Sequence, residues 1–186
     1  MKTFSFEDQE SYLKMTQAMV ELADTTIQNV KKLCTELRPS LLGDLGLGAA
    51  TEWQAEEFRR LTGTDCDLAV AFDGTDMDEP TRTAVFRIYQ EALTNVIRHA
   101  QATKVKVAMK RKGQSLTLEV QDNGKGITDE QISGPKAFGL LGMRERVQAL
   151  RGELKISGRP SKGTKIVVRV PLPSHRETDE KGTDSR

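Results

Sequence analysis

The chain has 186 residues, of which 37% are hydrophobic and 30% charged, as in a soluble globular protein with one domain and an additional element. Its 28 basic and 27 acidic residues nearly cancel, so net charge gives no reason to expect nucleic acid or an anionic membrane as partner. The two cysteines, Cys34 and Cys66, lack metal-ligand spacing, which argues against a disulfide scaffold or zinc site and fits a reducing cytosolic compartment. No apolar run reaches the roughly 20 residues of a membrane span, and the N-terminus lacks a signal-peptide core.

The first element in chain order is a long helix, expected over about residues 7–38. Apolar or small residues recur in two seven-residue series, Leu13, Val20, Ile27, Cys34 and Thr16, Ala23, Val30, Leu37. This spacing is typical of a helix in a bundle or coiled coil, although a helix lying on its own domain stays an alternative. Pro39 should end the helix, because the residue before a proline is disfavoured in the α region, and residues 40–50 should form a turn with a short apolar segment.

The rest of the chain alternates helices and strands. We expect, in order, a helix over 49–61 closed by Gly63, a strand over 66–72, a helix over 80–99, strands over 104–111 and 115–121, a mobile loop over 127–138, a helix over 140–151, and strands over 153–157 and 164–171. Several strand pairs read as hairpins, which favours an α+β fold. This would be a two-layer α/β sandwich with helices on one face of a mixed sheet, rather than a parallel Rossmann sheet. The polar tail, residues 174–186, is expected to be disordered.

One side of the helix 80–99 is polar. Its apolar side carries Val85, Ile88, Tyr89, Ala92, Val96 and Ala100. On another side Glu91, Asn95 and His99 are spaced four apart and should form a row. A surface helix often shows such a row for solubility alone, so the row indicates a site only together with other features.

Two segments that contain glycine follow this helix. Asp122-Asn123-Gly124-Lys125-Gly126 comes directly after a strand, where glycines let the backbone approach a ligand closely. Gly139-Leu140-Leu141-Gly142-Met143 opens a helix, where free N–H groups and the helix dipole favour phosphate. Each segment alone is equally compatible with an ordinary turn or a loop-to-helix junction.

The three features together predict a nucleotide site. An amide oxygen such as that of Asn95 is a neutral ligand that suits Mg²⁺ held mainly by phosphates and water. A buried carboxylate such as that of Asp122 can accept a hydrogen bond from an exocyclic amine like that of adenine. The GxxxxGK[ST] phosphate loop is absent from the sequence, so this is not a P-loop site.

In this order and spacing the segments resemble the ATPase fold shared by gyrase B, the mismatch-repair MutL proteins and histidine kinases, the Bergerat-type ATP-binding fold. EALTNVIRHA resembles the N box, DNGKGI the G1 box, FGLLGMRERV the G2 box and GTKIVVRVPLP the closing strand. The resemblance covers about residues 80–172. Upstream, ELRPSLLGDLGLGAATEWQAEEF resembles the end of a second dimerisation helix and the start of the catalytic domain in histidine kinases typified by nitrate and membrane-fluidity sensors.

The resemblance implies a role for each candidate residue. Asn95 would bind Mg²⁺, and Glu91 would support the metal shell and handle protons, which makes these two the catalytic residues. Asp122 would recognise adenine with help from Thr164. The other implied nucleotide contacts are Gly124 and Gly126 around the base, and Gly139, Leu140, Gly142, Met143, His99 and Arg146 on the phosphate side.

The resemblance further implies an ATP-dependent protein histidine kinase of a two-component system, with ATP and Mg²⁺ as cofactors. Its parts would be a partial dimerisation helix over 1–42, an ATP-binding catalytic domain over 43–173 and the tail 174–186. The two histidines, His99 and His175, do not lie on a bundle helix ahead of the LRPS segment. We therefore expect a fragment that binds Mg-ATP but does not phosphorylate itself at the usual site.

Partners follow from the same resemblance. The full-length protein is expected to form a homodimer through a helical bundle and to pass the phosphoryl group to an Asp of a response-regulator receiver domain. We expect this fragment to be cytoplasmic and to contact neither nucleic acid nor membrane, with any membrane anchor in a region outside it. Three alternatives stay open: an ATP-hydrolysing clamp of the gyrase/MutL type, a non-catalytic helical dimerisation module with a degenerate nucleotide fold, and an anti-sigma-type serine kinase.

Overall fold

The computed structural model describes residues 15–17, 19–20, 39–72, 74, 77–134 and 137–172. The chain divides into two compact units, Met1–Ser40 and Leu41–Arg186. In the first unit residues 15–17 and 19–20 are helical. The rest of the helix expected over 7–38 lies outside the described residues, as does the tail expected over 174–186. No helix within the described ranges is long and apolar enough to cross a membrane.

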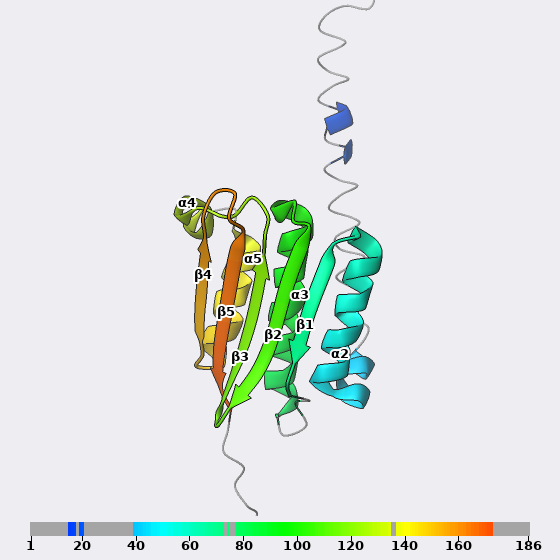
Figure 1. Cartoon of the computed structure of the whole chain (residues 1–186). Helices are drawn as coiled ribbons and strands as arrows, with labels where there is room; N and C mark the ends of the chain where they lie inside the picture. The colour runs from blue at the N-terminus through cyan, green and yellow to red at the C-terminus, as the bar shows by residue number, and fades with distance from the viewer. Residues whose placement is uncertain are drawn as a thin grey trace, which may run out of the picture. The chain divides into compact units, whose positions relative to one another are not determined.

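A five-stranded mixed sheet forms one layer of the second unit (Figure 1). Its strands lie in the order β1-β2-β3-β5-β4, with the bounds Asp65–Val70, Lys104–Lys112, Ser115–Asp122, Thr164–Pro171 and Glu153–Gly158. β1 is parallel to β2, and all other neighbouring strands are antiparallel. The α+β fold with a mixed sheet, expected from the sequence, is confirmed.

Two helices, α3 (Glu79–Asn95) and α5 (Phe138–Ala149), cover one face of the sheet (Figure 1). A third helix, α2 (Pro39–Thr62), packs beside α3, where Tyr89 donates a hydrogen bond to Thr51 O at 3.3 Å. Alternation along the strands places their apolar residues under the helices, because successive side chains point to opposite faces. The core contains Val105, Val107 and Met109 of β2 and all six apolar residues expected on the inner side of the helix 80–99.

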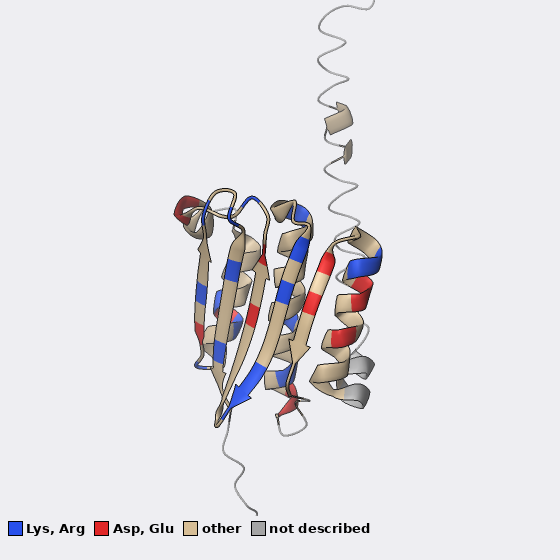
Figure 2. Ribbon diagram, viewed as in Figure 1, with Lys and Arg blue, Asp and Glu red and all other residues tan. Residues whose placement is uncertain are grey.

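The opposite face of the sheet carries charged side chains (Figure 2). Two cross-strand ion pairs lie there, Lys104 Nζ to Asp65 Oδ2 at 2.9 Å and Lys165 Nζ to Glu119 Oε1 at 2.6 Å. Lys110 of β2 is exposed on the same face. Ion pairs exposed to this degree contribute at most about 1 kcal/mol each, so this face is a solvated surface rather than a second core.

The turn expected over residues 40–50 is wrong, because this stretch is helical. α2 starts at Pro39, which suits the first turn of a helix since the N–H that proline lacks would have no helical acceptor. The helix is kinked at Gly46, whose φ of 77° and ψ of 174° interrupt the helical geometry. At its end Gly63, with φ 67°, donates its N–H to Arg59 O at 2.9 Å, so the predicted closure by glycine is confirmed.

A short helix, α4 (Asp129–Ser133), lies in the segment for which we expected only a loop. Gln131 N–H donates to Thr128 Oγ1 at 3.4 Å, and Thr128 N–H donates to Gln131 Oε1 at 3.0 Å. This reciprocal pair is a capping box, which starts a helix even when it is only one turn long. α5 then begins at Phe138, two residues earlier than expected.

Candidate functional site

α3 supplies the first polar groups of the site. Asp78 caps its N-terminus by accepting a hydrogen bond from Thr81 N–H at 2.9 Å, and Pro80 occupies its first turn. The buried apolar side of α3 fixes the rotation of the helix about its axis. Glu91 and Asn95 are half-buried on another side, one turn apart at the C-terminal end.

The start of α5 packs against these two residues. The backbone of Gly139 lies so close to α3 that a Cβ there would overlap Glu91 Oε1 and would lie 3.6 Å from Asn95 Oδ1. Glycine is therefore the residue that lets α5 begin here without displacing the Glu91 carboxyl group. Two segments that are separate in the sequence, the polar row and the second glycine segment, thus form one wall.

The Asn95 side chain has an orphaned atom, because its Nδ2 is buried and has no hydrogen-bond partner among the residues that the structure describes. A buried polar group without a partner is rare and costly, so this amide fits a place that a ligand completes. Within the described ranges, no group of three or more His, Cys, Asp or Glu residues could hold a metal ion. The donor set therefore fits Mg²⁺ that takes one amide oxygen and keeps phosphate and water ligands, and it does not fit a metal caged by side chains.

The end of the helix departs from α geometry. Val96–Ala100 form a π-helical turn, η1, and Gln101 after it has φ 52°. A π turn contains more residues than an α turn, so the angle between Asn95 and His99 about the helix axis differs from that of two residues four apart in an α-helix. His99 is exposed on η1, and its place in the row stays a prediction.

The loop after β3 forms a second wall. The side chain of Asp122 is buried, and its Oδ1 accepts a hydrogen bond from Gly124 N–H at 2.8 Å. Among the residues that the structure describes, none donates a hydrogen bond to Oδ2 of this carboxylate. A carboxylate oxygen is an acceptor, so Oδ2 can accept a hydrogen bond from a ligand donor.

η1 and this loop are bonded to each other through the backbone. Lys125 N–H donates to Ala100 O at 2.8 Å, and a Cβ at Gly124 would overlap the same carbonyl oxygen. Asn123 holds the loop from its other side, since its Oδ1 accepts from Thr103 N–H at 3.0 Å and its Nδ2 donates to Thr103 Oγ1 at 2.9 Å. Asn123 is therefore a structural residue of the loop rather than a ligand contact.

The turn between β4 and β5 clasps the same loop, a contact that the sequence analysis missed. Gly163 N–H donates to Gly124 O and Ser161 N–H donates to Lys125 O, both at 2.8 Å. Gly163 has φ 76°, and a Cβ there would overlap Asp122 O. The sequence signal for this contact was the pair of glycines at the two ends of the turn, because glycine permits both a positive φ and a close approach of the backbone.

Two further candidate residues, Gly126 and Thr164, lie beside this turn. Gly126 has φ 81° and lies directly against the backbone of the turn. Thr164 opens β5, in which the buried Ile166 pairs with Val120 of β3. Side chains alternate along strands, so Thr164 lies on the same face of the sheet as Asp122, two residues beyond Val120.

The N-terminus of α5 is open. Ala137 at the cap position makes no capping hydrogen bond through its side chain. Because the helix begins at Phe138, the N–H groups without a helical acceptor are those of Phe138, Gly139 and Leu140. Leu141 N–H already donates to Ala137 O at 2.9 Å. Within the described ranges nothing accepts from the first three N–H groups of α5, so they can donate to an anion at this end of the helix.

The other residues of the second glycine segment take different places. The side chains of Leu140 and Met143 are buried in the core, so only their backbone can face the site. The N–H groups of Gly142 and Met143 lie beyond the first turn and serve helical hydrogen bonds, which corrects their predicted role as free phosphate donors. Arg146 Nη1 would lie 3.0 Å from a Cβ at Gly142, so its guanidinium group folds back along α5.

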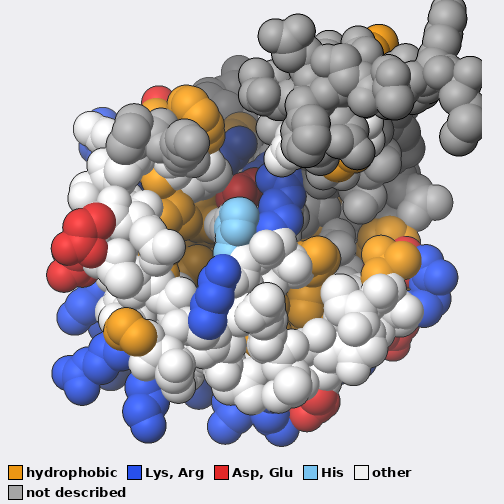
Figure 3. Space-filling model, turned by 90° about the horizontal axis from the view of Figure 1, so that it is seen from above, with side chains coloured by type: hydrophobic (Ala, Val, Ile, Leu, Met, Phe, Trp, Pro, Cys, Tyr) orange, Lys and Arg blue, Asp and Glu red, His pale blue; other side chains and the backbone are white. Residues whose placement is uncertain are grey.

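These elements meet at one end of the unit, the upper end in Figure 1, which Figure 3 shows from above. A hollow lies there, with basic side chains and a histidine around it and apolar side chains in its wall. This end of the unit carries the buried carboxylate of Asp122, the amide of Asn95 and the start of α5. This combination suits a ligand that has an amine-bearing base at one end and negative charge at the other.

Residues 81–174 match the family described as histidine kinase-, DNA gyrase B-, and HSP90-like ATPase. The match includes the polar end of α3, the loop after β3, the start of α5 and the turn before β5. Every element that lines the hollow therefore lies within the matched region.

Two relatives and one solved structure carry kinase names. The signal transduction histidine-protein kinase/phosphatase DegS of Brevibacillus brevis is 33% identical over 160 residues, which are 86% of this chain and 41% of that protein. The oxygen sensor histidine kinase NreB of Staphylococcus carnosus is 30% identical over 166 residues, 89% of this chain and 48% of that protein. The chain thus spans less than half the length of either relative. The histidine kinase domain of a blue-light activated histidine kinase from Erythrobacter litoralis has the same fold, with a TM-score of 0.60 and 23% identity over 68% of this chain and 61% of that chain.

Proposed function

Because the chain belongs to the family of histidine kinase-, DNA gyrase B- and HSP90-like ATPases, we propose that it is the ATP-binding catalytic part of a two-component sensor histidine kinase. Membership of this family supports ATP as the nucleotide. The observation that carries the proposal is the contact of Gly139 with Glu91 and Asn95, which joins the open start of α5 to the polar end of α3.

The base end of the nucleotide would lie at the loop after β3. Oδ2 of Asp122 would accept a hydrogen bond from the adenine amine, while Oδ1 stays bonded to Gly124 N–H at 2.8 Å. Thr164, on the same face of the sheet, would add a hydroxyl group beside this carboxylate. Gly124 and Gly126 would leave the pocket open, because no side chain projects from either position.

The phosphate end would lie between α3 and α5. The amide oxygen of Asn95 would hold Mg²⁺, which when bound offsets the negative charge of the phosphates. The N–H groups of Phe138, Gly139 and Leu140 would donate to phosphate oxygens. Glu91 would support the metal shell and handle protons, and the imidazole of His99 and the guanidinium group of Arg146 would complete the phosphate side.

The phosphoryl acceptor would be a histidine of a dimerisation helix, distinct from His99 and His175. Transfer forms a bond between that imidazole nitrogen and the γ-phosphorus, breaks the bond to the bridging oxygen and releases ADP. Since phosphoryl transfer depends mainly on positioning and charge stabilisation, the nucleotide site does its part without covalent chemistry. In this proposal residues 1–42 contribute to a bundle that dimerises, residues 43–173 bind Mg-ATP, and a receiver domain takes the phosphoryl group onward.

Isothermal titration of the chain with ADP in Mg²⁺ buffer tests the proposal. The wild-type chain should bind, and both Asp122→Asn and Asn95→Asp should weaken binding about 10-fold or more while the chain stays folded. Asp122→Asn keeps an acceptor for Gly124 N–H but replaces an acceptor oxygen by a donor, so its effect reports on the base amine. A folded wild-type chain that binds no nucleotide would refute the proposal.

The same samples separate a kinase from an ATP-hydrolysing clamp. A kinase part should show very slow steady-state ATP hydrolysis in the absence of an acceptor. Appreciable hydrolysis that Glu91→Ala abolishes would instead support the clamp.

A further inference from the structure

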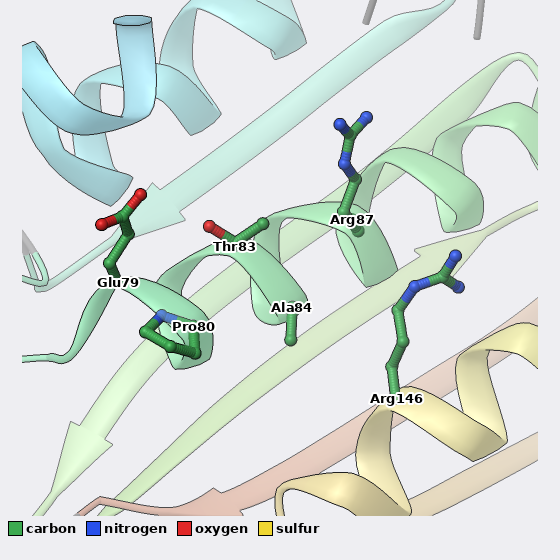
Figure 4. Close-up of a pocket in the computed structure, with 6 residues that line it drawn as sticks. All are labelled: Glu79, Pro80, Thr83, Ala84, Arg87 and Arg146. Carbon is green, nitrogen blue, oxygen red and sulfur yellow. The ribbon is translucent and has the colours of Figure 1, made fainter. Parts of the chain in front are cut away.

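A groove outside the nucleotide hollow runs between α3 and α5 on the side of the helices that faces away from the sheet. It is lined by Glu79, Pro80, Thr83, Ala84, Arg87 and Arg146 and has a volume of about 390 Å³ (Figure 4). The two helices run antiparallel along it, because the start of α5 contacts the end of α3 at Gly139 while Arg146, farther along α5, lines the groove with the first turns of α3. None of the roles proposed above accounts for Arg87.

Two guanidinium groups enter this groove from different helices. Figure 4 shows Arg87 extending from α3 and Arg146 extending from α5 on the same side. Arg87 is half-buried and donates one long hydrogen bond, 3.3 Å, to Gln90 Oε1. In the part of the chain that the structure describes, neither arginine forms an ion pair with a carboxylate.

The two positive charges in the groove have no negative partner among the described residues. Two cations that share a groove repel each other, and an anionic group placed between them removes that cost and can accept charge-assisted hydrogen bonds. The guanidinium fork suits a carboxylate in particular, because both carboxylate oxygens can accept parallel N–H donors. The acidic side chain of Glu79 lies at the other end of the groove and does not pair with either arginine.

One end of the groove, at Arg87, approaches the phosphate end of the site. Arg87 is one helical turn before Glu91 on α3, and the Arg146 guanidinium lies against Gly142 near the start of α5. A third helix can rest in a groove between two antiparallel helices, since the ridges of one helix pack into the grooves of its neighbours. A helix seated there would run along the first half of α3, with one end near Arg87, one turn before Glu91.

We propose that this groove docks a helix of the phosphoryl-accepting segment through a carboxylate held by Arg87 and Arg146. The identity of that segment rests on the proposed kinase function, whereas the recognition of an acidic helix does not. Arg87 is a positioning residue in this role, because it contacts the docked helix and not the nucleotide.

Fluorescence anisotropy with the full chain tests this inference. The probe is a labelled synthetic helical peptide of about 20 residues with Glu on one face, compared with an analogue that has Gln at the same positions. The wild-type chain should bind the Glu peptide about 3- to 10-fold more tightly than the Gln peptide. Arg87→Gln should bring this ratio close to 1 and leave the affinity for Mg-ADP unchanged.

Lys110→Gln is the matched control, because it removes one positive charge from the opposite face of the sheet. It should keep the wild-type ratio. Equal binding of both peptides by the wild type, or an equal loss of the ratio in Lys110→Gln, would overturn the proposal. If circular dichroism shows that Arg87→Gln does not fold, Arg87→Lys replaces it; that variant should give an intermediate ratio, and an unchanged ratio would count against the groove.

Arg146→Gln separates the two roles that this residue could have. Because Arg146 is also proposed for the phosphate side, this variant should lower both the peptide ratio and the affinity for Mg-ADP. Loss of ADP affinity with an intact ratio contradicts its part in docking. A chain that discriminates between the peptides but binds no ADP would refute the proposed function while leaving the acidic-helix groove intact.

Discussion

Gly139 and Glu91 are in such close contact that a methyl group on the glycine would occupy the position of the Glu91 Oε1 atom. This contact sets how near the open end of α5 comes to the polar end of α3. Asn95 Oδ1 lies just beyond it, 3.6 Å from the same Cβ position. The distance between the start of α5 and the polar end of α3 therefore depends on the absence of a side chain at Gly139.

Gly139→Ala should damage both the site and its stability. The added methyl group must displace the Glu91 carboxyl or shift α5, and overpacking of this kind costs about 1–3 kcal/mol. We expect a lower melting temperature and at least a 10-fold loss of Mg-ADP affinity, measured by thermal unfolding and calorimetric titration. Gly142→Ala is the matched control: its Cβ would meet only the flexible end of Arg146 at 3.0 Å, and alanine favours a helix over glycine by about 1 kcal/mol. If both variants lose the same affinity, the contact with Glu91 does not set the site.

Gly163→Ala should loosen the loop that carries Asp122. The new Cβ would overlap Asp122 O, and the φ of 76° is strained for alanine in addition. Gly113→Ala separates these two causes, because Gly113 has φ 58° but no atom within 4 Å of a Cβ. We expect Gly113→Ala to lower the free energy of unfolding by about 1 kcal/mol without changing ADP affinity. Gly163→Ala should lower the free energy of unfolding by more than Gly113→Ala does, and it should also weaken ADP binding. Equal denaturation midpoints for the two variants would mean that the overlap with Asp122 O costs nothing beyond the strain of the positive φ.

Removal of the metal should reveal the role of Asn95. In Mg²⁺ buffer, Asn95→Ala should bind ADP about 10-fold more weakly than the wild type, because the amide oxygen no longer supports the metal. In EDTA the wild type should fall to the level of the variant, so the two titrations converge. A difference between wild type and variant that persists in EDTA would show that Asn95 contacts the nucleotide directly.

Cys66 provides a probe of opening in the sheet. Its side chain is buried, and burial raises the pKa of this thiol, so the folded chain contains little of the reactive thiolate at pH 8. Since the folded pKa is above the unfolded one, the stability that the neutral thiol contributes is complete below the ordinary thiol pKa and is lost as the pH rises through the folded value. In a Cys34→Ser variant, labelling of Cys66 by iodoacetamide should be slow, should accelerate in denaturant, and should be slower with Mg-ADP present. Fast labelling of the folded variant at pH 8 would contradict this burial.

The elements of the second unit follow largely from local patterns in the sequence. Alternation predicted the strands, as in Val105, Val107 and Met109, because one buried face imposes a two-residue period. The apolar side of α3 was predicted for the same kind of reason. The helical start of α2 was missed because the glycines around the kink at Gly46, where two helical segments meet, look like a turn in the sequence.

The site was harder to predict because its contacts join distant segments. Glycines in the two segments could be found, but not that Gly139 meets Glu91 or that the β4–β5 turn bonds to the loop after β3. The capping box of Thr128 and Gln131 was visible in the sequence and would have corrected the loop prediction. The π turn at Val96–Ala100 has no signal of its own in the sequence, and its last carbonyl accepts a hydrogen bond from a distant residue, Lys125 N–H.

The clasp of the β4–β5 turn also has a consequence for biosynthesis. β5 is the last described strand in the chain, yet it lies inside the sheet between β3 and β4, and Leu172 N–H closes it by donating to Gln114 O at 2.8 Å. The loop with Asp122 therefore leaves the ribosome about forty residues before the turn that clasps it, and loop closure over that distance must precede the native contacts. A nascent chain gains its base pocket only when β5 has emerged, so nucleotide cannot assist the folding of the earlier strands.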